Sequence, residues 1–196
     1  MYLYGASGHA KVVLDILNAN GITVKAIVDD DPELSALCGV PVVHDAKGLS
    51  PMIISIGNCV NRRTIAEKLH CEFGSAIHPS AVISPSATLG EGTVVMAGAV
   101  INAETKVGCH CIINTKASID HECVIEDYCH IAPGCTISGA VHIGEGTWIG
   151  VGATIIHGIK VGRNCFIGAG SVIVNDIPDN SKAYGVPCRV VGTVDE

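Results

Sequence analysis

Aliphatic residues recur every six positions from Ile77 onward. The series contains seventeen successive Ile, Leu or Val residues, ends at Ile173 and has no break. A small residue usually follows four places after each of them, as at Ala81, Cys111 and Ser171. Neither an α-helix nor an ordinary strand has a period of six. The repeat therefore predicts a parallel β-helix, in which three hexads form one triangular coil, and it leaves no room for an insertion within 77–177.

Residues 1–76 follow a different pattern, in which short apolar runs alternate with turns and helical spacing. The expected strands and helices, in chain order, are strand Tyr2–Tyr4, helix Ala10–Asn20, strand Thr23–Val28, strand Met52–Ile56 and helix Arg62–His70. Strand, turn, helix and strand in this order predict a parallel α/β sheet. We therefore expect an α/β domain at 1–76 and a β-helix with its C-terminal tail at 77–196.

Charge and composition narrow the class of partner. The 196 residues carry a net charge of −7, with few lysines and arginines along the repeat. This balance argues against nucleic acid or an anionic membrane surface as the main partner. The apolar runs are far shorter than a membrane span, and the first residues do not resemble a signal peptide. We expect a cytoplasmic protein without membrane insertion.

The ten cysteines need neither a disulfide nor a metal. Five of them stand where other hexads have Ala or Thr, and we expect these thiols to fill the core as small hydrophobes: Cys111, Cys123, Cys129, Cys135 and Cys165. The chain contains no Cys-x-x-Cys pair, so a zinc site is not expected. Many free thiols suit a reducing compartment.

The turn Gly5–Gly8 is a candidate phosphate cradle. Its glycines permit close backbone approach, and its N–H groups precede a helix. Asp29 and Asp30 end the second strand, where an acidic residue in such folds binds a ribose or base. The motif departs from Gly-x-Gly-x-x-Gly, so a tight turn in a small α/β cap explains it as well.

Three segments together resemble one family. They are Gly5-Ala-Ser-Gly-His-Ala-Lys-Val-Val, then Ile56-Gly-Asn with Arg62, then the hexads with Asp120-His-Glu-Cys-Val-Ile. They are similar to the bacterial sugar O- and N-acyltransferases of sialic acid and bacillosamine pathways, within the left-handed β-helix acyltransferases. The tail from Tyr184, Tyr-Gly-Val-Pro-Cys-Arg-Val-Val, resembles the closing segment of that superfamily.

The resemblance implies a Rossmann-like domain that holds a nucleotide-linked sugar, often a UDP-4-amino sugar. It also implies a left-handed β-helix that forms a homotrimer and binds acetyl-CoA between subunits. The residues that fall at the nucleotide-sugar site are Ser7, Gly8, His9, Asp29, Asp30 and Gly57. His121 falls at the catalytic base and Glu122 at its acidic neighbour. The residues that fall at the acetyl-CoA site are His130, Val151 and Ala169. Two small departures, Ala169 for glycine and Cys188 for alanine, leave cofactor binding plausible.

The position of each histidine within its hexad indicates which of them could act as the base for acetyl transfer. His121 lies two places after an aliphatic position, so it is outside the core, and a pKa near neutrality suits the proton step. His157 lies in the same column two coils further on and is a second candidate. Glu122 is expected to orient His121, although a solvated surface acid is the plainer explanation of it.

A column of mostly large apolar residues recurs eighteen positions apart: Ile112, His130, Trp148 and Phe166. Each precedes an aliphatic position, so the column is expected to point outward. An outward apolar stripe on a prism needs a partner. A subunit interface or the pantetheine arm of acetyl-CoA would cover it.

Three other functions are alternatives. O-acetylation of a sialic acid or related sugar would use the same fold and cofactor. A metal-dependent β-helix hydratase of the carbonic anhydrase kind uses two histidines five residues apart, and no such pair occurs here. A purely structural β-helix would not need the Gly5–His9 turn. We therefore expect an acetyl-CoA-dependent sugar N-acetyltransferase with His121 as its base.

Overall fold

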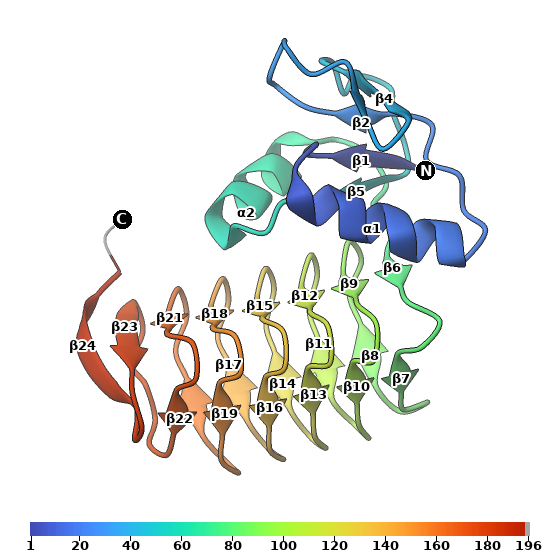
Figure 1. Ribbon diagram of the computed structural model, residues 1–196. Coiled ribbons are helices and arrows are strands. Elements are labelled where there is room, and N and C mark those ends of the chain that lie inside the picture. Colours follow the sequence, from blue (N-terminus) through green and yellow to red (C-terminus); the bar gives the residue numbers. More distant parts are fainter. Residues whose placement is uncertain (195–196) are drawn as a thin grey trace.

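A computed structural model describes residues 1–194 as an α/β part seated on a three-sided prism (Figure 1). The α/β part holds a five-stranded sheet in the order β3-β4-β2-β1-β5. Its elements are β1 (Tyr2–Tyr4), α1 (Gly8–Ala19), β2 (Ile27–Val28), β3 (Ala36–Leu37), β4 (Val40–Val43), β5 (Met52–Ile54) and α2 (Cys59–Lys68). The strands are parallel except for the pair β3 and β4.

The predicted α/β pattern is confirmed, with differences in the bounds of several elements. The second strand is reduced to Ile27–Val28, and the hairpin of β3 and β4 was not predicted. Helix α2 begins at Cys59, three residues earlier than expected, because the Asn58 side chain caps it by accepting a hydrogen bond from the Asn61 amide at 2.9 Å.

The prism has three faces, named here in the order in which the chain reaches them. The first face contains β6 (Ala76–Ile77), β9 (Val94–Val95), β12 (Ile112–Ile113), β15 (His130–Ile131), β18 (Trp148–Ile149) and β21 (Phe166–Ile167), followed by the tail strands β23 (Ser181–Tyr184) and β24 (Arg189–Thr193). The second face contains β7 (Val82–Ile83), β10 (Val100–Ile101), β13 (Ser118–Ile119), β16 (Thr136–Ile137), β19 (Thr154–Ile155) and β22 (Val172–Ile173). The third face contains β8 (Thr88–Leu89), β11 (Lys106–Val107), β14 (Val124–Ile125), β17 (His142–Ile143) and β20 (Lys160–Val161).

The register of the prism confirms the six-residue repeat. From β6 to β19, each strand pairs in parallel with the strand eighteen residues further on, as Val100 pairs with Ser118. The aliphatic positions from Ile101 to Ile173 point inward and are buried. The five cysteines predicted to fill the core are all buried, as expected. No insertion interrupts the series, so each side chain keeps its place from coil to coil.

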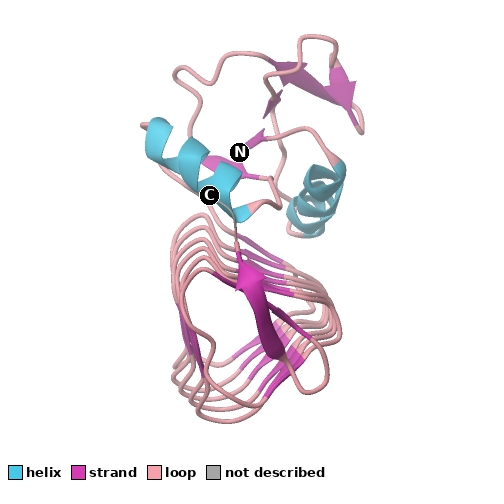
Figure 2. Ribbon diagram, turned by 90° about the vertical axis from the view of Figure 1, so that its left-hand side faces the viewer, coloured by secondary structure: helices cyan, strands magenta, loops and turns pink. Residues whose placement is uncertain are grey.

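The α/β part lies over the first face, on the coils of β9, β12 and β15 (Figures 1 and 2). Val13 and Leu17 of α1 belong to the same apolar cluster as Val94 and Ile112 of the prism. Ile112 and His130 are therefore buried within one chain, which corrects the expectation that their whole column is exposed. Only the later part of the column, at Trp148 and Phe166, reaches solvent.

Within residues 1–194, none of the helices combines the length and apolar character that crossing a membrane requires.

Candidate active site

His121 and Glu122 form a hydrogen-bonded pair on the turn between β13 and β14, which is the corner of the second and third faces. The Nδ1 atom of His121 lies 2.9 Å from Oε2 of Glu122, and their side chains are 47% and 61% exposed. Glu122 has a φ of +57°, a left-handed turn conformation that directs the chain around the corner. With Nδ1–H donated to Glu122, the Nε2 atom of His121 keeps a free lone pair.

Asp120 holds the backbone of His121, and Gly139 leaves space for its ring. The Asp120 carboxylate accepts hydrogen bonds from the His121 amide at 2.9 Å and from the Asn102 side chain at 3.0 Å. The ring lies over Gly139, where a Cβ atom would come within 2.6 Å of its Nε2. Gly139 was not among the predicted residues, and its position in the same column one coil later could have identified it.

His157, the second candidate base, lies in the same column as predicted. Its ring centroid is 6.2 Å from that of His121, with the two rings tilted by 46°. No carboxylate pairs with His157 among the described residues, in contrast to His121. This difference favours His121 as the base.

The Gly5–Gly8 turn joins β1 to α1 as expected of a phosphate cradle. A Cβ atom at Gly5 would lie 2.6 Å from the Ile56 side chain, and its φ of +101° excludes most other residues. Ser7 is the N-cap residue of α1 but makes no capping hydrogen bond with its side chain. Ser7 and Gly8 are exposed, so the first N–H groups of the helix are open to a ligand.

The two predicted aspartates have different tasks. Asp29 uses both carboxylate oxygens on the backbone: Oδ2 accepts from the Ala6 amide at 2.6 Å and Oδ1 from the Asp31 amide at 3.0 Å. Asp29 therefore holds the cradle in shape. Asp30 accepts the Tyr4 hydroxyl at 3.0 Å through Oδ1, and its Oδ2 has no partner among the described residues.

A cavity of about 300 Å³ opens beside these aspartates. It is lined by Tyr4, Gly5, Asp29, Asp30, Ile56, Asn61, Thr64 and Ile65. Burial, followed by the hydrogen bond to Asp30, raises the pKa of Tyr4 to about 12, so its hydroxyl stays protonated as a donor. The sequence did not identify Tyr4, Asn61 or Thr64, because only the folded α/β part brings β1 and α2 to the same cavity.

His130 connects the cradle to the prism. Its Nδ1 lies 3.1 Å from the Gly57 carbonyl and its Nε2 lies 3.1 Å from Nδ2 of Asn114, so Nδ1 carries the proton. Burial lowers the pKa of His130 to about 3 and that of His9, whose ring centroid is 6.4 Å away, to about 4. Both rings are therefore neutral, and the Gly57 carbonyl accepts hydrogen bonds from His130 and Arg62.

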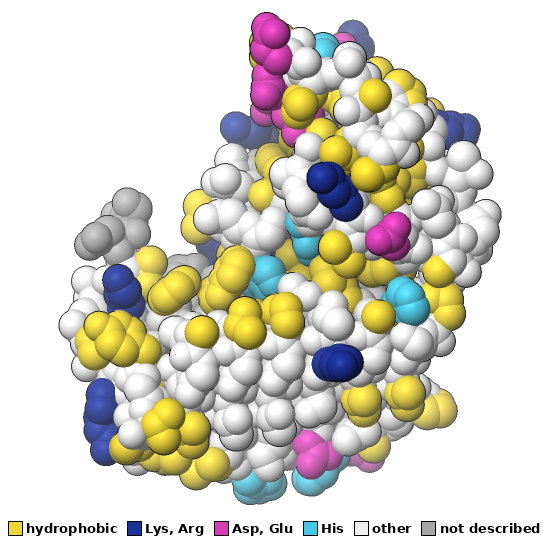
Figure 3. Space-filling model, in the orientation of Figure 1, with side chains coloured by type: hydrophobic (Ala, Val, Ile, Leu, Met, Phe, Trp, Pro, Cys, Tyr) yellow, Lys and Arg dark blue, Asp and Glu magenta, His cyan; other side chains and the backbone are white. Residues whose placement is uncertain are grey.

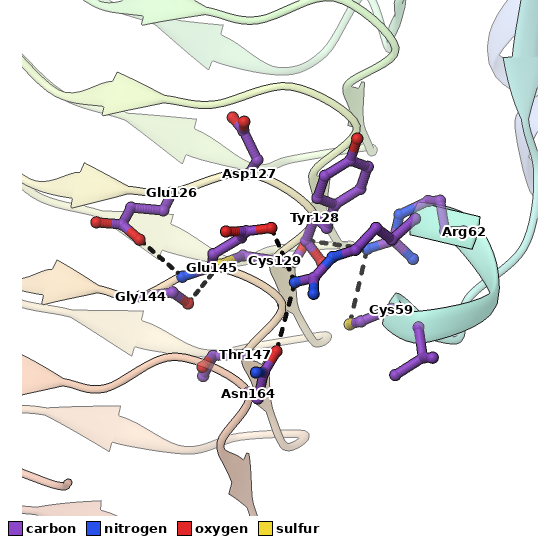
Figure 4. Close-up of polar contacts among 12 residues, drawn as sticks. Cys59, Arg62, Glu126, Asp127, Tyr128, Cys129, Gly144, Glu145, Thr147 and Asn164 are labelled. Carbon is purple, nitrogen blue, oxygen red and sulfur yellow. Dashed lines mark hydrogen bonds and ion pairs between the residues drawn. The ribbon is translucent and has the colours of Figure 1, made fainter. Parts of the chain in front are cut away.

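A buried arginine fastens α2 to the prism, as Figure 4 shows. Arg62 is 1% exposed and donates to the carbonyls of His110 at 2.7 Å, Tyr128 at 2.7 Å and Gly57 at 2.9 Å. No carboxylate pairs with it within residues 1–194. Neutral carbonyls thus hold this cation, and its charge contributes to keeping His9 and His130 neutral.

Apolar side chains continue from His130 along the first face. The ring centroids of His130 and Trp148 are 4.1 Å apart, and those of Trp148 and Phe166 are 6.5 Å apart. Val151 and Ala169 stand at the adjoining corner of the first and second faces, eighteen residues apart and both exposed. Hydrophobic side chains accordingly gather along the upper edge of the prism, below the α/β part (Figure 3).

The predicted residues fall into two groups that one chain does not bring together. The cradle residues belong to the α/β part, and His130 lies beneath that part on the first face. His121 and Glu122 lie at the corner of the second and third faces, which is opposite the first face in a triangular coil. The view along the prism shows the α/β part on one side only (Figure 2).

Two known families match separate parts of the chain, one in the α/β part and one in the prism. Residues 1–69 match the family described as the PglD N-terminal domain. Residues 104–139 and 140–175 match the bacterial transferase hexapeptide family of six repeats.

Solved structures resemble the whole chain. A mutant perosamine N-acetyltransferase from Caulobacter crescentus, in complex with CoA and GDP-perosamine, is 44% identical, with a TM-score of 0.94 and coverage of 97% of this chain and 96% of that one. The acetyltransferase domain of PglB from Neisseria gonorrhoeae, in complex with acetyl coenzyme A, is 39% identical, with a TM-score of 0.90 and coverage of 97% and 98%.

Among curated proteins, the UDP-N-acetylbacillosamine N-acetyltransferase of Bacillus subtilis is 40% identical over 108 residues. The match covers 48% of this chain and 50% of that protein, so the chain spans about half the length of this relative.

Proposed function

Because this chain belongs to the family of bacterial sugar acetyltransferases that join a PglD-type N-terminal domain to a left-handed β-helix, we propose that it acetylates an amino sugar. The acetyl donor is acetyl-CoA, and the acceptor is the amino group of a nucleotide-linked sugar such as a UDP-4-amino-4,6-dideoxy sugar. The observation that carries this proposal is the His121–Glu122 pair, in which Nε2 of an exposed imidazole remains free to accept a proton. Residues 1–76 would hold the nucleotide sugar, and residues 77–196 would bind acetyl-CoA and supply the base.

The chemistry requires one base and good positioning. His121 Nε2 takes a proton from the sugar amine while the amine nitrogen attacks the thioester carbonyl carbon. Glu122 stabilises the imidazolium through Nδ1–H at 2.9 Å. When the C–S bond breaks, the imidazolium returns the proton to the CoA thiolate. Holding the amine against the thioester saves an encounter entropy worth roughly 7–11 kcal/mol in the best cases.

The apolar stripe formed by Trp148 and Phe166 supports a site for the pantetheine arm. These rings lie next to the corner that carries Val151 and Ala169, the two exposed positions at which the family resemblance places acetyl-CoA. Phe166 is 42% exposed and Val151 is 53% exposed in a single chain. A bound thioester and a neighbouring subunit would cover both.

The separation of His121 from the cradle supports a homotrimer. One chain places its base on the corner opposite its own α/β part, so a sugar held by that part needs the base of another copy. Three prisms around a threefold axis would bring the base of each subunit to the cradle of the next. The acetyl group would then pass at the boundary between two subunits.

Mixing subunits tests this arrangement. His121→Ala removes the base and Gly8→Val blocks the cradle, so each homotrimer should be inactive in acetyl-CoA-dependent thiol release. Co-expressed with two different tags and purified through both, the mixed trimers should regain activity, because some boundaries pair an intact base with an intact cradle. A mixture as inactive as its parents, with trimers confirmed by light scattering, would contradict the shared site.

The acceptor is tested with the same thiol-release assay on a panel of UDP-, GDP- and dTDP-linked amino sugars and free sialic acids. Turnover confined to nucleotide-linked amino sugars is the expected result. Turnover on free sialic acids alone would replace N-acetylation by O-acetylation with the same fold and base.

A further inference from the structure

The outward side chains on the strands of the second face are uncharged. They alternate with the buried aliphatic residues along each strand and stack from coil to coil. They are Val82, Val100, Ser118, Thr136, Thr154 and Val172. The corresponding column of the third face contains Lys106, His142 and Lys160, and the α/β part lies over the first face (Figure 1). Because like charges of three copies would meet around a threefold axis, the second face is the one suited to face that axis.

This orientation brings two particular corners together at every boundary between subunits. The corner of the first and second faces in one subunit meets the corner of the second and third faces in the next. Rotation about an axis parallel to the prisms leaves the height of each coil unchanged, so the two turns that meet belong to the same coil. In the coil of β13, one of these turns contains Lys116 and the other contains Asp120 and His121.

Lys116 and Asp120 carry opposite charges at the two edges of the second face. Lys116 stands two positions before β13 and Asp120 directly after it, whereas both positions hold uncharged residues in the other coils. Lys116 is exposed, and no carboxylate pairs with it within residues 1–194 of one chain. The opposite charges therefore occur in the one coil that carries the base, His121.

The local structure leaves both charged groups available. Lys116 has a φ of +57°, and its side-chain stem lies over Gly98, where a Cβ atom would be 3.4 Å from Cγ of Lys116. The following coils have glycine at this left-handed position, as at Gly134. Oδ1 of Asp120 accepts hydrogen bonds from Asn102 and from the His121 amide, and its Oδ2 has no partner among the described residues. A lysine held where glycine is easier to accommodate points to a use for its ammonium group.

On the basis of the proposed function and its trimer, we infer that Lys116 of each subunit forms an ion pair with Asp120 of the next, on the axis side of the shared active site. Asp120 already holds the His121 amide at 2.9 Å, so the pair fixes the base of one subunit against the acetyl-CoA corner of its neighbour. Glu122 lies two residues further toward the third face, and its Oε2 is bonded to His121. Lys116 is thus a positioning residue that acts through Asp120.

Steady-state thiol release from acetyl-CoA, with a UDP-4-amino-4,6-dideoxy sugar as acceptor, tests this role. Lys116→Asn removes the ammonium group, and asparagine tolerates the left-handed conformation. On trimers shown by sedimentation to be intact, kcat should fall about ten- to a hundredfold, the effect of a base displaced by about 1 Å, with both KM values unchanged. Lys116→Arg keeps the charge and should retain most of the activity. An unchanged kcat in Lys116→Asn, or a raised KM for the sugar in its place, would overturn the inference.

Dissociation of the trimer on dilution provides a second measurement, which needs no substrate. Lys116→Asp places two carboxylates at each boundary, so the trimer should dissociate at a protein concentration about tenfold higher than wild type. Adding Asp120→Lys restores opposite charges and should restore most of the trimer's stability. Lys106→Asp makes the same change of charge at an exposed position of the third face and should dissociate like wild type. A double variant no more stable than Lys116→Asp would overturn the ion pair.

The two measurements separate this inference from the proposed function. Wild-type trimers that transfer acetyl groups, with every Lys116 variant behaving as wild type, would refute the ion pair and leave the function intact. Trimers that respond to charge reversal as expected, yet release no thiol with any nucleotide-linked amino sugar, would support the ion pair and refute the proposed acceptor. A monomeric wild-type protein would refute both the ion pair and the shared site.

Discussion

At the scale of single residues, His121 is the side chain on which the proposed reaction depends. His121→Ala should lower the turnover number about 10²–10⁴-fold, the usual contribution of a general base. Its exposure should keep the cost in stability small. Glu122→Gln should lower turnover less, because Glu122 only orients and stabilises the imidazole. The measurement is thiol release at saturating acetyl-CoA and amino sugar.

The prism offers two matched controls for this substitution. The Nε2 atom of His142 on the third face lies 2.8 Å from Oε1 of Glu126, and both side chains are exposed to a similar degree as those of His121 and Glu122. His157 lies in the column of His121 but has no carboxylate partner among the described residues. Both His142→Ala and His157→Ala should remain close to wild type. An inactive His157→Ala with an active His121→Ala would move the base two coils along the same column.

The sequence identified those candidate residues whose arrangement depends only on neighbouring positions in the chain. His121 and Glu122 are adjacent, and their place in the hexad puts both outside the core. The role of Asp29 as a brace depends on Ala6, and the burial of Arg62 depends on carbonyls 48 and 66 residues away. Periodicity holds no information on contacts between the α/β part and the prism, so these roles could be found only in the fold.

At the scale of elements, close contact between successive coils sets which turn residues are allowed. A Cβ atom at Gly144 would lie 2.5 Å from the amide nitrogen of Arg163 in the next coil. Gly144→Ala should therefore lower the melting temperature by several degrees, since backbone atoms must move apart. Gly134→Asn is the control: Gly134 has a φ of +67°, open space around it, and a conformation that asparagine tolerates. Equal losses would contradict the contact argument.

Elements were predictable to the extent that their residues repeat. The strands of the prism can be predicted from the hexads because the same aliphatic position recurs seventeen times along the chain. In the α/β part each element occurs once. Thr23–Val28 has strand-like composition, yet only Ile27–Val28 finds strand partners in β1 and β4. The β3–β4 hairpin turns at Cys38 and Gly39, a pair that carries no strong turn signal in the sequence.

At the scale of the whole molecule, buried neutral histidines make stability depend on pH. Burial lowers the pKa of His9 and His110 to about 4 and that of His130 to about 3, against 6.5 for an ordinary histidine. Between pH 6.5 and about 4 the unfolded chain therefore binds more protons than the folded chain. The stability that the neutral rings contribute should therefore have its full value above pH 6.5, and the free energy of unfolding should decrease as the pH falls below 6.5.

Urea unfolding at pH 7.5, 6 and 5 measures this dependence. His110→Asn should flatten it, because His110 is buried with no partner for its Nδ1 among the described residues, and asparagine tolerates its φ of +52°. His44→Asn is the control, because His44 is exposed and lies just after the end of β4. Stability that rises on acidification would contradict the neutral state of these rings.

The register of the prism also limits how such a molecule can change during evolution. Loss or gain of one hexad would move every later strand to the next face and carry each later turn to a different corner. Only a whole coil of eighteen residues preserves the alignment of all three faces. A lineage can therefore lengthen or shorten the wall beyond Gly139 in complete coils, and so adapt it to a longer or shorter acyl donor, while the base and the cradle keep their places.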